Sequence, residues 1–193
     1  MAKRNDALDR RRALIVVSGM QGAGKTTVAG RLALRFERAV HVEADVLHKM
    51  IVSGRAWPSA VDEMSPEFHE QLRLRLRNMC LLGRSFYDAG FTAVLDDIVI
   101  GTRIGHLLEN LAGVEFYFVM LTPALDAVKE RELGRGTRLF EEWAYLDEEI
   151  RSRTQRVGLW LDTSRLGAEE TVGEIMRRVW SEGLVQARPS RER

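Results

Sequence analysis

The sequence predicts an α/β protein in which a parallel β-sheet is covered by helices on both faces. Short apolar runs recur along the 193 residues, and each is followed by a stretch in which apolar residues have helical spacing. The runs are apolar throughout instead of alternating, which is typical of parallel strands buried on both faces. Because ligands bind beyond the carboxyl ends of such strands, the residues that follow each strand are the candidates for function.

Five segments are predicted to be strands, and helices are expected between them. The longest helix is predicted from Pro66 to a C-terminal glycine, Gly90, because apolar residues recur there every three or four positions. The loop between Ser53 and Ser65 contains Gly, Pro and Trp, and its length suggests a functional role. The predicted strands are 13–18, 39–44, 91–97, 114–121 and 159–164, and the predicted helices are 25–37, a short one from Asp45, 66–89, one opened by Pro123 and 168–182.

The composition limits the class of protein. The chain has 29 Lys plus Arg and 28 Asp plus Glu, and this near-neutral balance does not favour nucleic acid or a membrane as a partner. A single cysteine, Cys80, excludes a disulfide framework and a zinc cluster of several thiolates. The sequence lacks a secretory signal or a membrane-spanning run, so we expect a cytoplasmic protein. One domain is predicted over 13–183, with a flexible N-terminal arm, 1–12, and a disordered tail, 184–193.

The first predicted strand leads into a glycine-rich turn, GMQGAGKTT, at residues 19–27. Gly19, four further residues and then Gly24-Lys25-Thr26 fit the P-loop pattern, which requires this position between a buried strand and a helix. Glycines let backbone N–H groups converge on phosphate oxygens, and the helix N-terminus adds positive partial charge. Lys25 is expected to reach the β- and γ-phosphates, and Thr26 to ligate Mg²⁺. The predicted nucleotide-binding residues are Gly19, Gln21, Gly22, Ala23, Gly24, Lys25, Thr26 and Thr27.

Three aspartates follow strands at the edge of the sheet that carries this turn. Asp45 is predicted to orient an acceptor hydroxyl and to take its proton, and the structural alternative is an N-cap of the following helix. Asp96 and Asp97 cannot both be buried and ionised without cations or hydrogen-bond donors nearby. We assign Asp96 to the metal and Asp97 to the acceptor, although alternation along the strand leaves their order open.

An arginine-rich segment, KERELGRGTR, covers residues 129–138. Glycines between the arginines suit a mobile lid that brings cations to the γ-phosphoryl group. Arg135 and Arg138 are predicted to be catalytic, and Arg131 to contact the nucleotide. A solvated, charged helix end is the alternative interpretation.

Two further residues are candidates for the acceptor side of the site. Trp57, in the loop after the second strand, could line an apolar pocket. His48 lies three residues after Asp45 and could share its helix face, although a core or exposed histidine is the more common outcome.

Together these motifs resemble the P-loop kinases, and among them the chloramphenicol phosphotransferase-like group. The resemblance rests on GMQGAGKTT, on Asp45 in VEADVL, and on SPEF, VLDDIVIG, RELGRGTR and LDTS, in this order over residues 13–180. It implies a five-stranded parallel sheet in the order 2-3-1-4-5 and ATP-Mg²⁺ as the donor. The γ-phosphoryl group would pass to a hydroxyl of a small molecule, an antibiotic or a metabolite. It also implies that Asp45 is the general base, that Lys25 and Thr26 hold phosphate and metal, and that Arg135 and Arg138 are lid contacts.

Other functions stay open at this point. A nucleoside or nucleotide kinase would need an acceptor site that contains arginines. A nucleotide-gated regulatory ATPase would use the P-loop as a switch and would hydrolyse ATP slowly. Related enzymes often form pairs, so a homodimer is also an open expectation.

Overall fold

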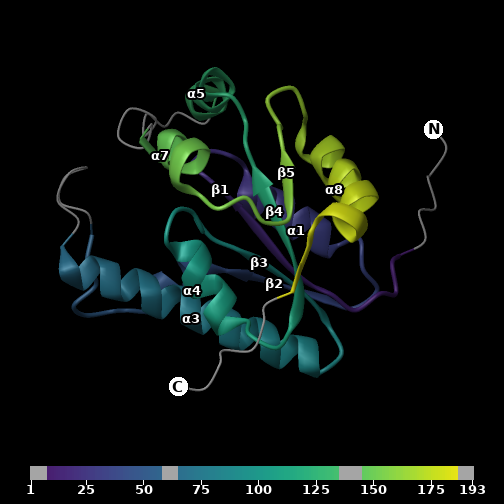
Figure 1. The fold of residues 1–193 in the computed structure, drawn as a ribbon, viewed down its shortest axis with the longest axis horizontal. Helices are drawn as coiled ribbons and strands as arrows, with labels where there is room; N and C mark the ends of the chain where they lie inside the picture. The colour runs from purple at the N-terminus through teal and green to yellow at the C-terminus, as the bar shows by residue number, and fades with distance from the viewer. Residues whose placement is uncertain (1–7, 58–64, 135–144, 187–193) are drawn as a thin grey trace.

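The computed structural model describes residues 8–57, 65–134 and 145–186. Its centre is a sheet of parallel strands in the order β2-β3-β1-β4-β5 (Figure 1), which confirms the predicted fold class and strand order. The central strand, β1, pairs with β3 on one side and with β4 on the other, so that Val17 lies opposite both Asp96 and Val119. The strands are β1 (Leu14–Gly19), β2 (Ala39–Glu43), β3 (Thr92–Asp96), β4 (Glu115–Leu121) and β5 (Leu159–Leu161).

Helices cover both faces of this sheet (Figure 1). On one face α1 (Lys25–Ala33) packs beside α8 (Ala168–Glu182), and on the other α3 (Pro66–Asp88) packs beside α4 (Arg103–Asn110). The Ser65 side chain accepts the Phe68 N–H at 3.1 Å and caps α3, whose first residue is proline as in many helices. The remaining helices are α2 (Ala44–Lys49), α5 (Leu125–Gly134) and α7 (Tyr145–Glu148), which continues into a π-helical turn, η1 (Glu149–Arg153). No helix in the described ranges is long and apolar enough to cross a bilayer.

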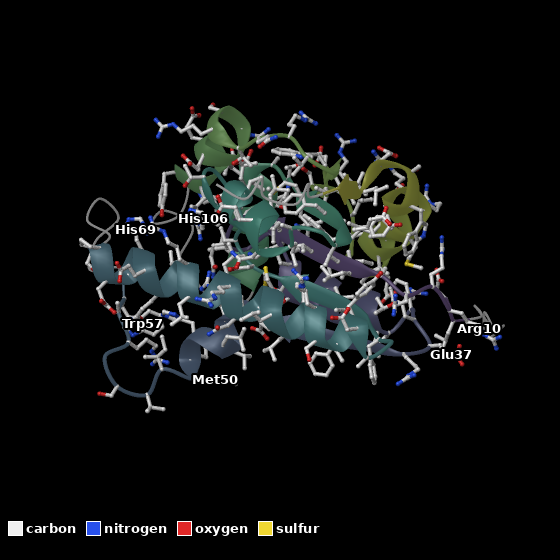
Figure 2. The ribbon with its side chains drawn as sticks, turned by 60° about the horizontal axis from the view of Figure 1, so that its bottom comes forward. Arg10, Glu37, Met50, Trp57, His69 and His106 are labelled. Atoms are coloured by element: carbon white, nitrogen blue, oxygen red, sulfur yellow. The ribbon has the colours of Figure 1, made fainter. Side chains whose placement is uncertain are left out.

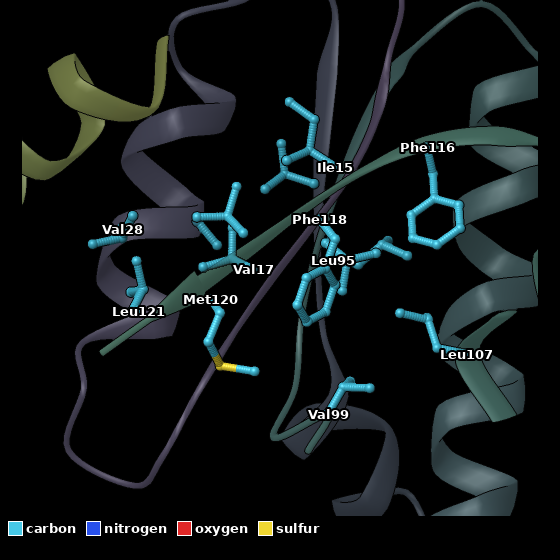
Figure 3. Close-up of a cluster of buried hydrophobic side chains, with 14 of the residues drawn as sticks. Ile15, Val17, Val28, Leu95, Val99, Leu107, Phe116, Phe118, Met120 and Leu121 are labelled. Atoms are coloured by element: carbon cyan, nitrogen blue, oxygen red, sulfur yellow. The ribbon is translucent and has the colours of Figure 1, made fainter. Parts of the chain in front are cut away.

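The core consists of apolar side chains on the two faces of the sheet. Figure 3 shows strand residues such as Val17 and Phe116 between helices, with Val28 contributed by α1 and Leu107 by α4. All four side chains are buried. Because both faces are covered, the carboxyl edge of the sheet is where polar side chains can gather.

The described terminal stretches pack on the body, although the sequence predicts a flexible arm and a disordered tail there. The Asp9 N–H donates to Arg35 O at 2.8 Å, and the Glu37 N–H donates to Asp9 O at 2.9 Å. At the other end β6 (Leu184–Gln186) pairs antiparallel with β4, and its Val185 is buried. Within the described residues, the domain therefore extends beyond 13–183 at both ends.

One helix and two element boundaries also differ from the sequence prediction. Helix α4 was not predicted, although Ile104, Leu107 and Leu111 have helical spacing and are buried. Helix α1 ends at Ala33 instead of residue 37, because the chain then turns to form a bridge with Asp9. Strand β5 ends at Leu161, where Asp162 accepts the Ser164 N–H and turns the chain.

Candidate active site

The turn between β1 and α1 borders a small polar cavity. Gly22 and Gly24 have φ angles of 77° and 91°, a conformation that L side chains rarely adopt, and Gly24 is the N-cap of α1. Such a turn before a helix N-terminus is the geometry that binds phosphate. The cavity has a volume of about 120 Å³ and is lined by Gln21, Gly22, Gly24, Lys25, Thr26, Thr27, Asp45, Asp96, Asp97 and Ile98.

Two predicted nucleotide residues support the turn instead of lining the cavity. Gly19 ends β1 below the turn, where a Cβ atom would lie 2.8 Å from Leu121 O. Ala23 is buried, and its N–H donates to Met20 O at 3.2 Å. Their contribution is therefore to let the turn pack closely on the sheet.

Lys25 is the cation of the cavity. Its Nζ donates to Met20 O at 2.9 Å, a bond within the turn itself. Burial lowers the pKa of Lys25, and the charges of Asp96, Asp97 and Asp45 oppose that shift. The lysine is therefore a donor near three carboxylates, and a phosphate oxygen could replace its backbone acceptor.

Asp96 is held at the end of β3 by two donors. It is 3% exposed, and it accepts Thr26 Oγ1–H at 2.9 Å through Oδ2 and His41 Nε2–H at 2.6 Å through Oδ1. A carboxylate and a hydroxyl in contact at a phosphate cavity fit Mg²⁺, which prefers a few protein oxygens together with phosphate oxygens and water. Thr26 and Asp96 could therefore hold the metal as the sequence predicts.

The other two aspartates share one arginine. Arg75, on α3, is 9% exposed; its Nη1 donates to Asp45 Oδ1 at 3.0 Å and its Nη2 donates to Asp97 Oδ1. Asp97 Oδ1 also accepts the Ile98 N–H at 2.7 Å. The guanidinium thus compensates a buried carboxylate and orients an exposed one, since the Asp45 side chain is 61% exposed.

The structure contradicts the N-cap alternative for Asp45. Glu43 occupies the N-cap of α2, and Asp45 lies in the first turn of the helix. With the capping position filled by another residue, the Asp45 carboxylate borders the phosphate cavity as expected for an acceptor-binding group.

His48 and Trp57 do not line this cavity. His48 is 5% exposed, its Nε2 lies 3.3 Å from Ala56 O, and its ring packs edge-on against Trp57 and Phe68. Trp57 is 61% exposed, with the Arg55 guanidinium 4.9 Å from its ring centre. His48 is therefore a core histidine, which is the alternative given for it in the sequence analysis. Its ring packs against the ring of Trp57.

Arg131 anchors the turn that follows β5. Its Nη2 donates to Thr163 O at 2.5 Å and to Leu166 O at 3.2 Å, and the residue does not line the phosphate cavity. The predicted lid residues Arg135 and Arg138 lie outside the described residues.

The sequence analysis missed Arg75 and His41, and each had a detectable signal. Arg75 follows Phe68 by seven residues and Leu72 by three, so it falls on the buried face of α3, where an arginine needs a charged partner. His41 is a polar residue within a predicted strand, and β2 pairs with β3 so that its neighbour Glu43 lies opposite Asp96. Both residues act by holding a cavity carboxylate.

The strand order, the phosphate turn after β1 and the buried aspartate at the end of β3 define an α/β protein with the P-loop kinase fold. Residues 14–156 match the model of the family described as AAA domain, and the chain belongs to that family.

The chain is also similar to individual kinases and to one resistance protein. A shikimate kinase from Syntrophus aciditrophicus (strain SB) is 27% identical over an alignment of 192 positions that covers 87% of this chain and 91% of the relative. The tunicamycin resistance protein of Deinococcus radiodurans superposes with a TM-score of 0.64 at 21% identity, covering 91% of this chain and 99% of that chain. A sugar kinase from Janibacter sp. HTCC2649 gives 0.61 at 22% identity, with coverages of 86% and 94%. The two structural likenesses show the fold.

Proposed function

We propose that the protein is an ATP-dependent kinase that transfers the γ-phosphoryl group to a hydroxyl of a small molecule. The observation that carries the proposal is one cavity in which Lys25, Thr26, Asp96 and Asp45 meet at the phosphate turn. Lysine and hydroxyl suit the donor phosphates, and a separate, exposed carboxylate suits the acceptor. The similarity to a shikimate kinase and a sugar kinase supports the same reaction class.

In the proposed reaction the acceptor oxygen attacks the γ-phosphorus while the bond to the β–γ bridging oxygen breaks. The hydroxyl proton passes to Asp45, and the products are a phosphate ester and ADP. Arg75 holds Asp45 through Oδ1, so that the carboxylate keeps its second oxygen for the acceptor hydroxyl. Lys25 exchanges Met20 O for a phosphate oxygen and stabilises the developing charge.

Thr26 Oγ1 and the Asp96 carboxylate would hold Mg²⁺, the latter directly or through water. The ion would supply charge neutralisation at the β- and γ-phosphate oxygens. Arg135 and Arg138 are proposed to complete the site from the segment that follows α5.

The test is a transfer assay with γ-labelled ATP and Mg²⁺ against phenicols, other hydroxylated antibiotics, sugars, shikimate, nucleosides and nucleotides. The Lys25→Ala variant is the blank. Asp45→Asn should lose at least about 100-fold in turnover and retain ATP affinity, because it removes the proton acceptor and spares the phosphate turn. Asp88→Asn, an exposed aspartate at the end of α3, is the matched control and should leave turnover unchanged.

Each outcome selects between the functions. Label transferred to a phenicol would place the protein with the chloramphenicol phosphotransferase-like group, and label on a nucleotide would favour the nucleotide kinase. Label released only as phosphate would refute transfer to a small molecule and favour a regulatory ATPase. Full turnover by Asp45→Asn would remove Asp45 as the base.

A further inference from the structure

A second cavity, of about 200 Å³, lies between α3, α4 and α7. It opens on α3 residues N-terminal to Arg75 and on the first turns of α4, which begins soon after Asp97. Figure 2 shows two of its labelled lining residues, His69 and His106, at the same end of the molecule. Its polar lining consists of His69, Arg73, Thr102, Arg103, His106, Tyr145 and Glu149.

The lining carries an excess of basic groups. Two arginines and two histidines face one acidic residue, Glu149, and that carboxylate already lies 3.7 Å from Arg153. Within the part of the chain that the structure describes, the side chains of Arg73, Arg103, His69 and His106 have no hydrogen bond or ion pair. His106 Nδ1 is fully buried and still unpartnered there. Arg73 and His69 are exposed, whereas Arg103 and His106 are partly buried. Guanidinium groups at a cavity suit a carboxylate or phosphate, with which they form charge-assisted hydrogen bonds.

The second cavity adjoins the phosphate cavity. Burial lowers the pKa of Arg103, and the strongest opposing charge is that of Asp97, which lines the phosphate cavity. The charge of Arg75 also acts on Arg103. Arg73 and His69 lie four residues apart on α3 and so share one face of the helix that carries Arg75. Three lining residues of the second cavity, Ile100, Thr102 and Arg103, follow the phosphate-cavity residue Asp97 within six positions, so the two cavities are linked by this short segment.

We propose that this cavity binds an anionic group of the acceptor, a carboxylate or a phosphate, with Arg103 and Arg73 as its principal ligands. The inference rests on the proposed function, because it identifies which small molecules that kinase accepts. The acceptor is then a compact hydroxylated acid or a phosphorylated polyol, whose anionic end lies among the basic side chains while a hydroxyl reaches Asp45. Trp57 is not among the residues that line this cavity.

The experiment compares anions with neutral compounds of the same shape. Gluconate is paired with glucitol, shikimate with its methyl ester, and glucose 6-phosphate with glucose, so that carboxylate and phosphate are tested in separate arms. Phosphoryl transfer gives kcat and KM, and calorimetry without ATP gives binding of each compound and of inorganic phosphate. The variants are Arg103→Gln and Arg73→Gln, and the matched control is Arg77→Gln, an exposed arginine on α3 that lies outside the cavity.

For at least one pair, we expect the anion to bind and react and its neutral partner to fail. Arg103→Gln should raise the KM for the anion about 10- to 100-fold, the effect of losing a charge-assisted hydrogen bond, while ATP affinity stays unchanged. A KM increase with little change in kcat separates anion binding from a general loss of structure, which would lower both. Arg77→Gln should behave as the wild type.

The proposed function and the anion site fail in different ways. Transfer to neutral compounds with unchanged KM in Arg103→Gln would leave the kinase standing and overturn the anion site. Anion binding that Arg103→Gln abolishes, without transfer to any acceptor, would support the site and overturn the kinase. No binding of any of these anions, inorganic phosphate included, at millimolar concentration would overturn the anion site whatever the transfer assay shows.

Discussion

Replacing Arg75 with methionine should lower the free energy of unfolding by about 3 kcal/mol, because it leaves a buried carboxylate without its cation. The Asp97 side chain is 3% exposed, and breaking such a pair costs about 3–5 kcal/mol. The lower end applies because Asp97 keeps the Ile98 N–H at 2.7 Å and lies near Lys25. The second contact, with the largely exposed Asp45, adds at most about 1 kcal/mol.

Urea unfolding of four variants tests this reasoning. Arg77 follows Arg75 by two residues but is exposed, so Arg77→Met should change the free energy of unfolding by no more than about 0.5 kcal/mol. The double variant Arg75→Met with Asp97→Asn removes both charges and should recover stability to within about 1 kcal/mol of the wild type. Asp97→Asn alone leaves Arg75 with Asp45 and should cost less than Arg75→Met. A loss below about 1 kcal/mol for Arg75→Met, or no recovery in the double variant, would refute the account.

Three other predictions concern separate parts of the chain. His41→Ala removes a hydrogen bond that holds the Asp96 carboxylate, so it should raise the Mg²⁺ concentration for half-maximal turnover about 10-fold. ATP binding without Mg²⁺ should not change. An unchanged Mg²⁺ dependence would contradict the role of His41 in positioning Asp96. Burial raises the pKa of Cys80 to about 12, whereas the unfolded thiol ionises from about 9.0. Because only the unfolded state loses this proton between the two values, the free energy of unfolding should fall as pH rises through that range. Unfolding of the wild type and of Cys80→Ala at several pH values in the range measures the difference. Val185→Asp should destabilise the fold by at least about 2 kcal/mol more than Leu184→Asp, since Val185 is 8% exposed and Leu184 41%. Thermal unfolding of both variants measures this difference, and equal shifts would mean that burial of β6 does not contribute to stability.

The fold could be predicted from the sequence because its signals are local. Continuous apolar runs such as that of β1 identify buried parallel strands, and the spacing from Pro66 onward gives α3 almost to the residue. Strand β6 was missed because three residues next to a polar terminus carry too little pattern, and only the pairing with β4 makes them a strand. Helix α4 was missed because its eight residues bury only two apolar side chains, Ile104 and Leu107, which is a weak periodic signal.

The candidate site was predictable where one motif defines it and less so where it depends on tertiary contacts. The phosphate turn is contiguous, so Lys25 and Thr26 were found together. Arg75 lies 30 residues from Asp45 and 22 from Asp97, and nothing local marks it as their shared partner. The second cavity depends on α4, which the sequence analysis did not contain, so its basic lining could not be anticipated.

The carboxylates of the phosphate cavity are all held before any nucleotide is present. Asp96 has Thr26 and His41, Asp97 has Arg75 and the Ile98 N–H, and Asp45 has Arg75. The cation of the cavity, Lys25, instead donates its hydrogen bond to a neutral acceptor, the backbone carbonyl of Met20. Binding of phosphates would then require the exchange of one lysine contact, and the proposed base, Asp45, and the proposed metal ligand, Asp96, need not move. A site whose charges are fixed in advance in this way loses little energy to reorganisation during phosphoryl transfer.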